Sequence, residues 1–187
     1  TDKTGIEEFA RGLHELRITL WSTGGTAGRI RAAGLPVSDV SELVGEPLFD
    51  DLVKTLSREV AAGCLCDPLD PEHVPQIIKN AIRVFEVVCV NFYALEVAIA
   101  KPDATPEAVR LATDVGGPTM AHEGAKGRKN GYRVVVVDPA DYGTVLSWLK
   151  LGKPNAGEFV RGFAAKAEFT VSKYLAASAR HLGGELD

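Results

Sequence analysis

The sequence predicts one α/β domain in which helices cover a mostly parallel β-sheet. Three observations predict this fold class. The apolar runs 87–90 and 134–137 lie in the predicted strands 84–91 and 133–137 and are typical of strands buried inside a parallel sheet. Segments with apolar residues at helical spacing lie between such runs, and this alternation of strand and helix indicates a parallel sheet with helices on its faces. With 187 residues, 45% of them hydrophobic and 25% charged, the chain has the size and composition of one compact domain.

The first part of the chain alternates between helix and strand. The expected elements are a turn and helix over 1–16, a strand over 17–22, a short helix over 27–33 that ends at Gly34, and an extended piece over 36–40. The helix follows Thr1 almost at once. Because a phosphate loop at this place normally follows a strand, we expect a further strand before residue 1.

The rest of the chain is interrupted by proline and glycine before it becomes regular again. One amphipathic stretch, 52–60, stands out within 46–70. Beyond it we expect helices over 74–80 and 105–113, strands over 84–91 and 133–137, a helix that starts after Gly116-Gly117, a helix over 139–149, and one long helix or a bent pair over 155–182. The core therefore lies at about 1–138 and a C-terminal helical part at about 139–187.

Charge, apolar runs and cysteines exclude several classes of partner. A net charge of −4 argues against a nucleic-acid groove, which needs a basic face. No run reaches the roughly 20 apolar residues of a membrane span. Three cysteines form no disulfide framework, and the Cys64-x-Cys66 pair lacks a matching pair of ligands. We expect a cytoplasmic protein without a metal site and with neither nucleic acid nor membrane as a partner.

Three glycine- and hydroxyl-bearing loops precede helices, where backbone N–H groups are free to bind an anion. The first is 1–5, with Thr1, Lys3 and Thr4; the second is 22–26, with Thr23, Gly24, Gly25 and Thr26; the third is 114–119, with Asp114, Gly116 and Gly117. Each loop also has a structural explanation: N-capping by Asp2 or Thr4, a tight strand-to-helix turn, and a helix-to-helix turn, respectively. Two such loops at one end of a parallel sheet favour a phosphate site.

Seven segments resemble the IMP cyclohydrolase domain of the bifunctional purine biosynthesis enzyme. They are TDKTG, STGGTA, AGLPVSDVSELVG, VKTL, VNFY, DVGGPTM and VVVVDPADY, in this order. The resemblance runs through nearly the whole chain. It implies a three-layer methylglyoxal-synthase-like fold with added C-terminal helices. It also implies closure of 5-formamidoimidazole-4-carboxamide ribonucleotide to IMP with loss of water, without metal or cofactor.

The resemblance also implies site residues. The catalytic positions of the family match Lys54, Tyr93, Asp114 and Lys126, and its phosphate and substrate contacts match Thr1, Lys3, Thr4, Thr23, Gly24, Gly25, Thr26, Thr55, Asn91, Gly116 and Gly117. Lys54 would stabilise the oxyanion or position the carboxamide, Asp114 would move a proton or accept from the amide, and Lys126 would polarise the formyl oxygen.

Departures from the family concentrate around the VKTL segment. Leu52 stands where the family has arginine, Ser57-Arg58 where it has histidine-proline, and Ala61 where it has a second histidine. Leucine cannot replace the bidentate donor that arginine provides. His122 could replace an arginine, or it could be an ordinary exposed histidine. The chain could therefore act on a related carboxamide ribonucleotide, or be a catalytically weak nucleotide-monophosphate-binding or regulatory module.

The partners follow from the same resemblance. The transformylase domain of the bifunctional enzyme is absent from this sequence, so a separate transformylase would supply the formylated substrate. The family's dimers and the long terminal helix predict a homodimer.

Overall fold

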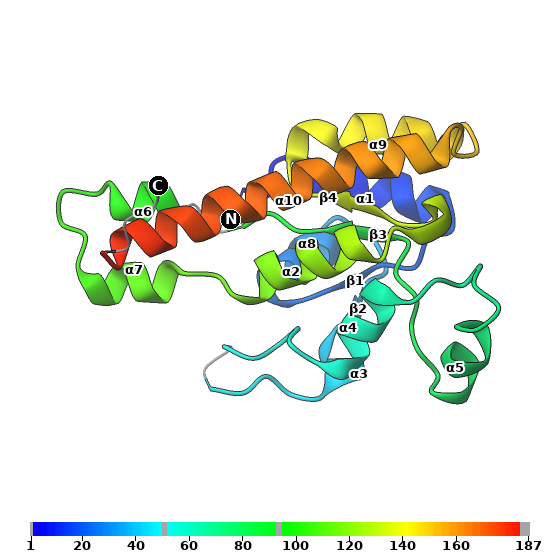
Figure 1. Cartoon of the computed structure of the whole chain (residues 1–187), viewed down its shortest axis with the longest axis horizontal. Coiled ribbons are helices and arrows are strands. Elements are labelled where there is room, and N and C mark those ends of the chain that lie inside the picture. The colour runs from blue at the N-terminus through cyan, green and yellow to red at the C-terminus, as the bar shows by residue number, and fades with distance from the viewer. Residues whose placement is uncertain (1, 50–51, 93–94, 184–187) are drawn as a thin grey trace.

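A computed structural model of the chain describes residues 2–49, 52–92 and 95–183 (Figure 1). Its strands form two parallel pairs. β1 (Trp21–Ser22) pairs with β2 (Ser38–Asp39), and β3 (Val87–Cys89) pairs with β4 (Val134–Val136). The predicted α/β fold class with parallel pairing is confirmed.

The regular strands are shorter than the apolar runs predicted. Hydrogen bonds continue one residue beyond β3, from Val90 N–H to the Val136 carbonyl and from Val134 N–H to the Glu86 carbonyl. At Phe85 the pairing stops for a physical reason. Its N–H donates to the Gly63 carbonyl, and its own carbonyl accepts from the side chain of Arg133. Both backbone groups of Phe85 are thus used outside the sheet.

Helices occupy most of the predicted positions. The first five are α1 (Ile6–Glu15), α2 (Gly24–Ala32), α3 (Ser41–Val44), α4 (Arg58–Leu65) and α5 (Val74–Lys79). The amphipathic stretch predicted over 52–60 is helical only from Arg58, where the hydroxyl of Ser57 caps α4 by accepting from Val60 N–H at 3.1 Å. Gly34 follows the end of α2 with φ of 75°, as expected of a residue that ends a helix.

The later helices cover the paired strands. They are α6 (Leu95–Ile99), α7 (Pro106–Ala112), α8 (Gly116–Lys126), α9 (Tyr142–Lys150) and α10 (Ala156–His181), with two short 3₁₀ helices, η1 (Lys129–Gly131) and η2 (Pro139–Asp141). α10 is one continuous helix, which decides between the two predicted forms of the tail. Figure 1 shows it running along the long axis of the molecule, with α9 beside its first half and α6 and α7 near its end. No helix in the described part of the chain, α10 included, combines the length and apolar character needed to cross a membrane.

β4 divides the core into two packed layers. Val134 and Val136 face a cluster built largely from α1 and α9, in which Phe9 stacks on Tyr142 with ring centroids 4.3 Å apart. Val135 faces the opposite cluster, which includes alanines of α8 and α10 such as Ala121 and Ala167. Because side chains alternate between the two faces of a strand, three consecutive buried valines require helices on both sides. The resulting three layers are those expected.

A buried guanidinium ties several loops to β4. Arg133 is fully buried, and its donors bond to the backbone carbonyls of Phe85 (2.6 Å), Gly127 (2.6 Å), Gly63 (2.7 Å) and Cys66 (3.0 Å). Burial lowers the pKa of Arg133 because it penalises the charged form. Four well-placed acceptors compensate for that penalty, so Arg133 fastens α4 and the 63–66 segment to the sheet.

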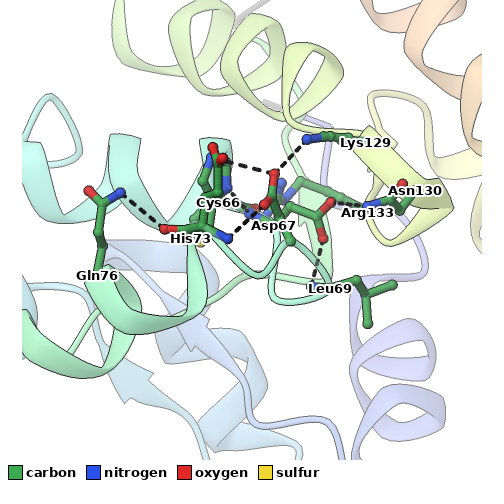
Figure 2. A network of polar contacts seen from close by, with 10 residues as sticks. Cys66, Asp67, Leu69, His73, Gln76, Lys129, Asn130 and Arg133 are labelled. Carbon is green, nitrogen blue, oxygen red and sulfur yellow. Dashed lines mark hydrogen bonds and ion pairs between the residues drawn. The ribbon is translucent and has the colours of Figure 1, made fainter.

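A polar network lies beside Arg133 and joins the 67–73 segment to the loop before β4 (Figure 2). The buried carboxylate of Asp67 accepts from the side chain of Asn130 at 2.6 Å, and the N–H of Asp67 donates to Nδ1 of His73 at 3.0 Å. The neighbouring Asp70 carboxylate accepts from the Lys129 ammonium at 2.5 Å. These contacts hold η1 in place.

Stability should fall in acid partly through Asp70. The Lys129 hydrogen bond, and then the backbone N–H of Glu72, hold the pKa of Asp70 below its ordinary value. A carboxyl group whose pKa is lower in the folded chain stabilises it above the unfolded pKa of about 4, and that contribution disappears as the pH falls through the folded pKa. Urea unfolding from pH 7 to pH 3 should show a steeper loss of stability for the native chain than for Asp70→Asn. Equal slopes would contradict this role.

Candidate functional site

The first loop directs a lysine toward the second. Asp2 Oδ1 accepts from Thr4 N–H at 2.8 Å and forms a turn, and Gly5, with φ of 70°, precedes α1 as its N-cap without any side-chain bond. Neither Asp2 nor Thr4 therefore caps the helix itself. The Lys3 ammonium lies 3.2 Å from the position that a Cβ on Gly25 would occupy. A side chain at Gly25 would fill the space beside this ammonium.

The second loop is the N-terminus of α2. Thr23 is its N-cap in an extended conformation, and Gly24 has φ of 46°, a region that favours glycine. The first helical hydrogen bond runs from Ala27 N–H to the Thr23 carbonyl. The N–H groups of Gly24, Gly25 and Thr26 therefore have no acceptor within the helix, and they form the positive end of its dipole. This arrangement suits a phosphate group.

Lys54 reaches the same helix end from another segment. The Leu48–Val53 bridge turns the chain back, and the Lys54 ammonium lies 3.9 Å from the Cβ position of Gly24. Lys54, Thr23 and Gly24 line a pocket of about 220 Å³ together with Asp39. The N–H of Ser41 holds the pKa of Asp39 below its ordinary value, with smaller contributions from Arg31 and Lys54. The ammonium groups of Lys3 and Lys54 thus both approach the N-terminus of α2, and Lys54 also lines the pocket there.

The third loop joins this site through Thr55. Thr55 Oγ1 lies 2.7 Å from the Cβ position of Gly116, at the start of α8. Asp114 Oδ1 accepts from Gly117 N–H at 2.9 Å, and Asp114 N–H donates to the Tyr174 hydroxyl at 2.5 Å. The Asp114 carboxylate is thereby held next to the glycine pair. Tyr174 is not among the site residues predicted from the sequence.

Gly117→Ala should disturb this loop. A Cβ there would lie 2.6 Å from Asp114 Oδ2 and 3.1 Å from Val90 Cγ1, so the carboxylate would have to move. We expect at least about a tenfold loss of turnover, because small displacements of a positioned group cost large factors in rate. Steady-state kinetics measures this effect, and Gly28→Ala, where a Cβ meets nothing within 4 Å, is the matched control. Equal activity of both variants would exclude Asp114 from the reaction.

Asn91 connects β3 to the first loop. Its Nδ2 donates to the Asp2 carbonyl at 2.8 Å and to the Tyr142 hydroxyl at 3.1 Å. Its Oδ1 is enclosed and accepts from none of residues 2–49, 52–92 or 95–183. Burial raises the pKa of Tyr142, so this hydroxyl stays neutral. Asn91 therefore lies at the site mainly as a brace of the Lys3 loop.

Lys126 lies elsewhere in the molecule. It ends α8, ten residues beyond Gly116, a separation of about 15 Å along the helix axis. It lines a different pocket, beside Arg128 and Arg161. Within one copy of the chain, Lys126 is thus separate from the loop site that contains Lys3, Lys54 and Asp114. Thr1 and Tyr93, also predicted site residues, lie outside the described residues.

His122, considered as a substitute for arginine, contacts the tail. Its Nδ1 lies 2.9 Å from both carboxylate oxygens of Glu168 on α10, and its side chain is 61% exposed. This position supports the ordinary surface interpretation. In the described part of the chain, no group of three or more His, Cys, Asp or Glu side chains is arranged to hold a metal ion.

Two comparisons with known proteins bear on this geometry. The family model of the MGS-like domain matches residues 5–119, more than half of the chain. Among solved structures, the crystal structure of ForH matches with a TM-score of 0.85 and 31% sequence identity, covering 98% of this chain and 93% of ForH. The ForH match extends through the C-terminal helices, which the family model leaves out.

Proposed function

The chain belongs to the MGS-like domain family, and from this membership we propose that it is a cyclohydrolase of the IMP cyclohydrolase type. It would close 5-formamidoimidazole-4-carboxamide ribonucleotide to IMP with loss of water, or act on a related carboxamide ribonucleotide. The observation that supports this proposal best is the convergence of Lys3 and Lys54 on the N-terminus of α2.

The two lysines suggest a division of labour. Lys3 and the N–H groups of Gly24, Gly25 and Thr26 would hold the phosphate. Lys54 approaches the same helix end from a different segment, next to Thr55 and the third loop. It is therefore assigned to the reacting end of the substrate, where its positive charge would stabilise the developing oxyanion.

The reaction is balanced without any further reactant. The carboxamide nitrogen attacks the formyl carbon and forms the new C–N bond, while the formyl oxygen gains negative charge. The carboxamide nitrogen loses one proton, the formamide nitrogen loses the other, and the formyl oxygen leaves with both as water while a C=N bond forms between the formyl carbon and the formamide nitrogen. Asp114 is the proposed proton acceptor, and Tyr93 remains a proposed participant. Much of the rate would come from holding the two arms of the substrate in attack geometry.

A second function has a specific observation in its favour. Leu52 and Phe49 on the segment before Lys54 are 64% and 73% exposed and offer no polar group to a substrate. A chain that binds the phosphate end but lacks the arginine expected at position 52 would be a nucleotide-monophosphate-binding or regulatory module.

One experiment separates the two functions. The purified protein is mixed with the formylated ribonucleotide while absorbance reports IMP, and calorimetry measures the binding of IMP. Turnover supports the cyclohydrolase. Tight IMP binding without turnover would sink it and leave the binding module. A panel of related carboxamide ribonucleotides then defines the preferred substrate, and sedimentation analysis tests the proposed homodimer.

A further inference from the structure

A second pocket lies where the loop between α8 and β4 meets the start of α10. Its volume is about 420 Å³. It is lined by Lys126, Arg128, Lys129, Asn130, Gly131, Gly157, Val160 and Arg161, and we call it the basic pocket. It shares no lining residue with the pocket that contains Lys54.

The charge of the basic pocket is one-sided. Four of its eight lining residues are lysine or arginine, and none is acidic, although the chain as a whole has a net charge of −4. Like charges gathered in one concavity repel one another. An anion bound among them would relieve that repulsion, and a pocket with charges of one sign concentrates ligands of the other.

Two of the four cations are already engaged. Lys129 bonds the Asp70 carboxylate at 2.5 Å, and Arg128 donates to the Ala125 carbonyl at 2.6 Å. Lys126 and Arg161 are exposed, and across 2–49, 52–92 and 95–183 neither forms an ion pair or a side-chain hydrogen bond. These two side chains remain for a ligand.

The backbone gives this pocket a fixed floor. Asn130 and Gly131 have φ of 57° and 70°, which turns the loop back against α10. A Cβ on Gly131 would lie 3.0 Å from the backbone nitrogen of Gly157, so the loop packs directly on the first turn of the helix. Asn130 is held by Asp67, and Lys129 by Asp70. The neighbours of Lys126 and Arg161 are therefore positioned before any ligand arrives.

We propose that the basic pocket is a second binding site, which takes a small anion bearing a phosphate or diphosphate group. Arg161 supplies a planar, bidentate donor, and Lys126 supplies a point charge beside it. The volume is within the range of pockets that hold small molecules. The positive end of the 26-residue helix α10 adds to the field of the side chains.

Inorganic pyrophosphate is the probe that tests this site. Calorimetry at low ionic strength compares the native chain with two double variants, Lys126→Gln/Arg161→Gln for the basic pocket and Lys3→Gln/Lys54→Gln for the loop site. The matched control is Lys173→Gln/Arg180→Gln, which removes the same charge from exposed positions farther along α10. Circular dichroism verifies that all four proteins are folded.

The native chain and the control should bind pyrophosphate in two events. In each site variant one of the two events should weaken or disappear. For the basic-pocket variant we expect the affinity of that event to fall about tenfold or more. Unchanged binding by Lys126→Gln/Arg161→Gln would overturn the proposal. So would an equal loss in the control, since the effect would then follow net charge alone. If Lys3→Gln/Lys54→Gln keeps both binding events while Lys126→Gln/Arg161→Gln loses one, the result counts against the phosphate end of the proposed function and supports the basic pocket.

The same measurement identifies the form of the ligand. Inosine monophosphate and inorganic phosphate are added as competitors to the Lys3→Gln/Lys54→Gln variant, in which the basic pocket binds alone. If both competitors displace pyrophosphate, the pocket binds phosphate esters as well as free phosphate. If only inorganic phosphate displaces pyrophosphate, the pocket binds the free oxyanion.

Discussion

Lys54→Ala should lower the rate constant of ring closure by about 10²–10³-fold, because removing one preorganised donor from a developing oxyanion typically has this effect. The ammonium of Lys54 shares its pocket with Thr23 and Gly24, and no other lysine or arginine among the described residues lines that pocket. Stopped or continuous absorbance assays of IMP formation measure the change.

Lys3→Ala is the informative comparison for this result. Lys3 faces Gly25 rather than Gly24 and is assigned to the phosphate. Its loss should mainly raise KM, whereas loss of Lys54 should mainly lower kcat. Full activity of Lys54→Ala would remove this residue from the mechanism, and a pure KM effect would move it to the phosphate end.

Arg133→Met should destabilise the fold by about 2–4 kcal/mol. Four backbone carbonyls would lose their donor, at a cost of about 1–3 kcal/mol each, partly offset because a buried charge is removed as well. Urea denaturation followed by circular dichroism gives the difference in free energy of unfolding. Arg110→Met removes a surface ion pair with Glu107 and should leave the free energy of unfolding nearly unchanged, because exposed ion pairs contribute little.

Arg133→Lys distinguishes charge from geometry. Lysine keeps the positive charge but places all its donors on one nitrogen, whereas Arg133 uses three different nitrogens for the carbonyls of Phe85, Gly127 and Gly63. We therefore expect this variant to be nearly as unstable as Arg133→Met. Native stability of Arg133→Lys would mean that charge alone is needed at this position.

The fold was largely predictable because its signals are local. Several helices end next to a glycine, α4 and α7 begin at the capping hydroxyls of Ser57 and Thr105, and apolar residues recur at helical spacing, so helix positions follow from sequence. The strand lengths could not be predicted in the same way. Phe85 is as apolar as Val84 and Val87, and only the tertiary contacts of its backbone with Gly63 and Arg133 remove it from the sheet.

The candidate site was predictable in composition and less so in arrangement. The lysines and glycines of the loops stand out in the sequence, and the structure brings Lys3 and Lys54 to one helix end. Lys126 is separated from the loop site because it stands at the far end of α8. The number of residues between Asp114 and Lys126 gives this separation only if α8 is known to be one straight, complete helix. Tyr174, sixty residues from Asp114, could be placed there only by the packing of α10.

The bond from Asp114 to Tyr174 has a consequence for how the protein opens. The first half of α10 is packed on the sheet, while its second half meets α6 and ends beside the Asp114 loop. When that second half undocks, the amide proton of Asp114 loses its acceptor and exchanges with solvent. The exchange rate of this single proton therefore reports the docking equilibrium of the distal helix, and truncation of the chain within that half should speed it without unfolding β4.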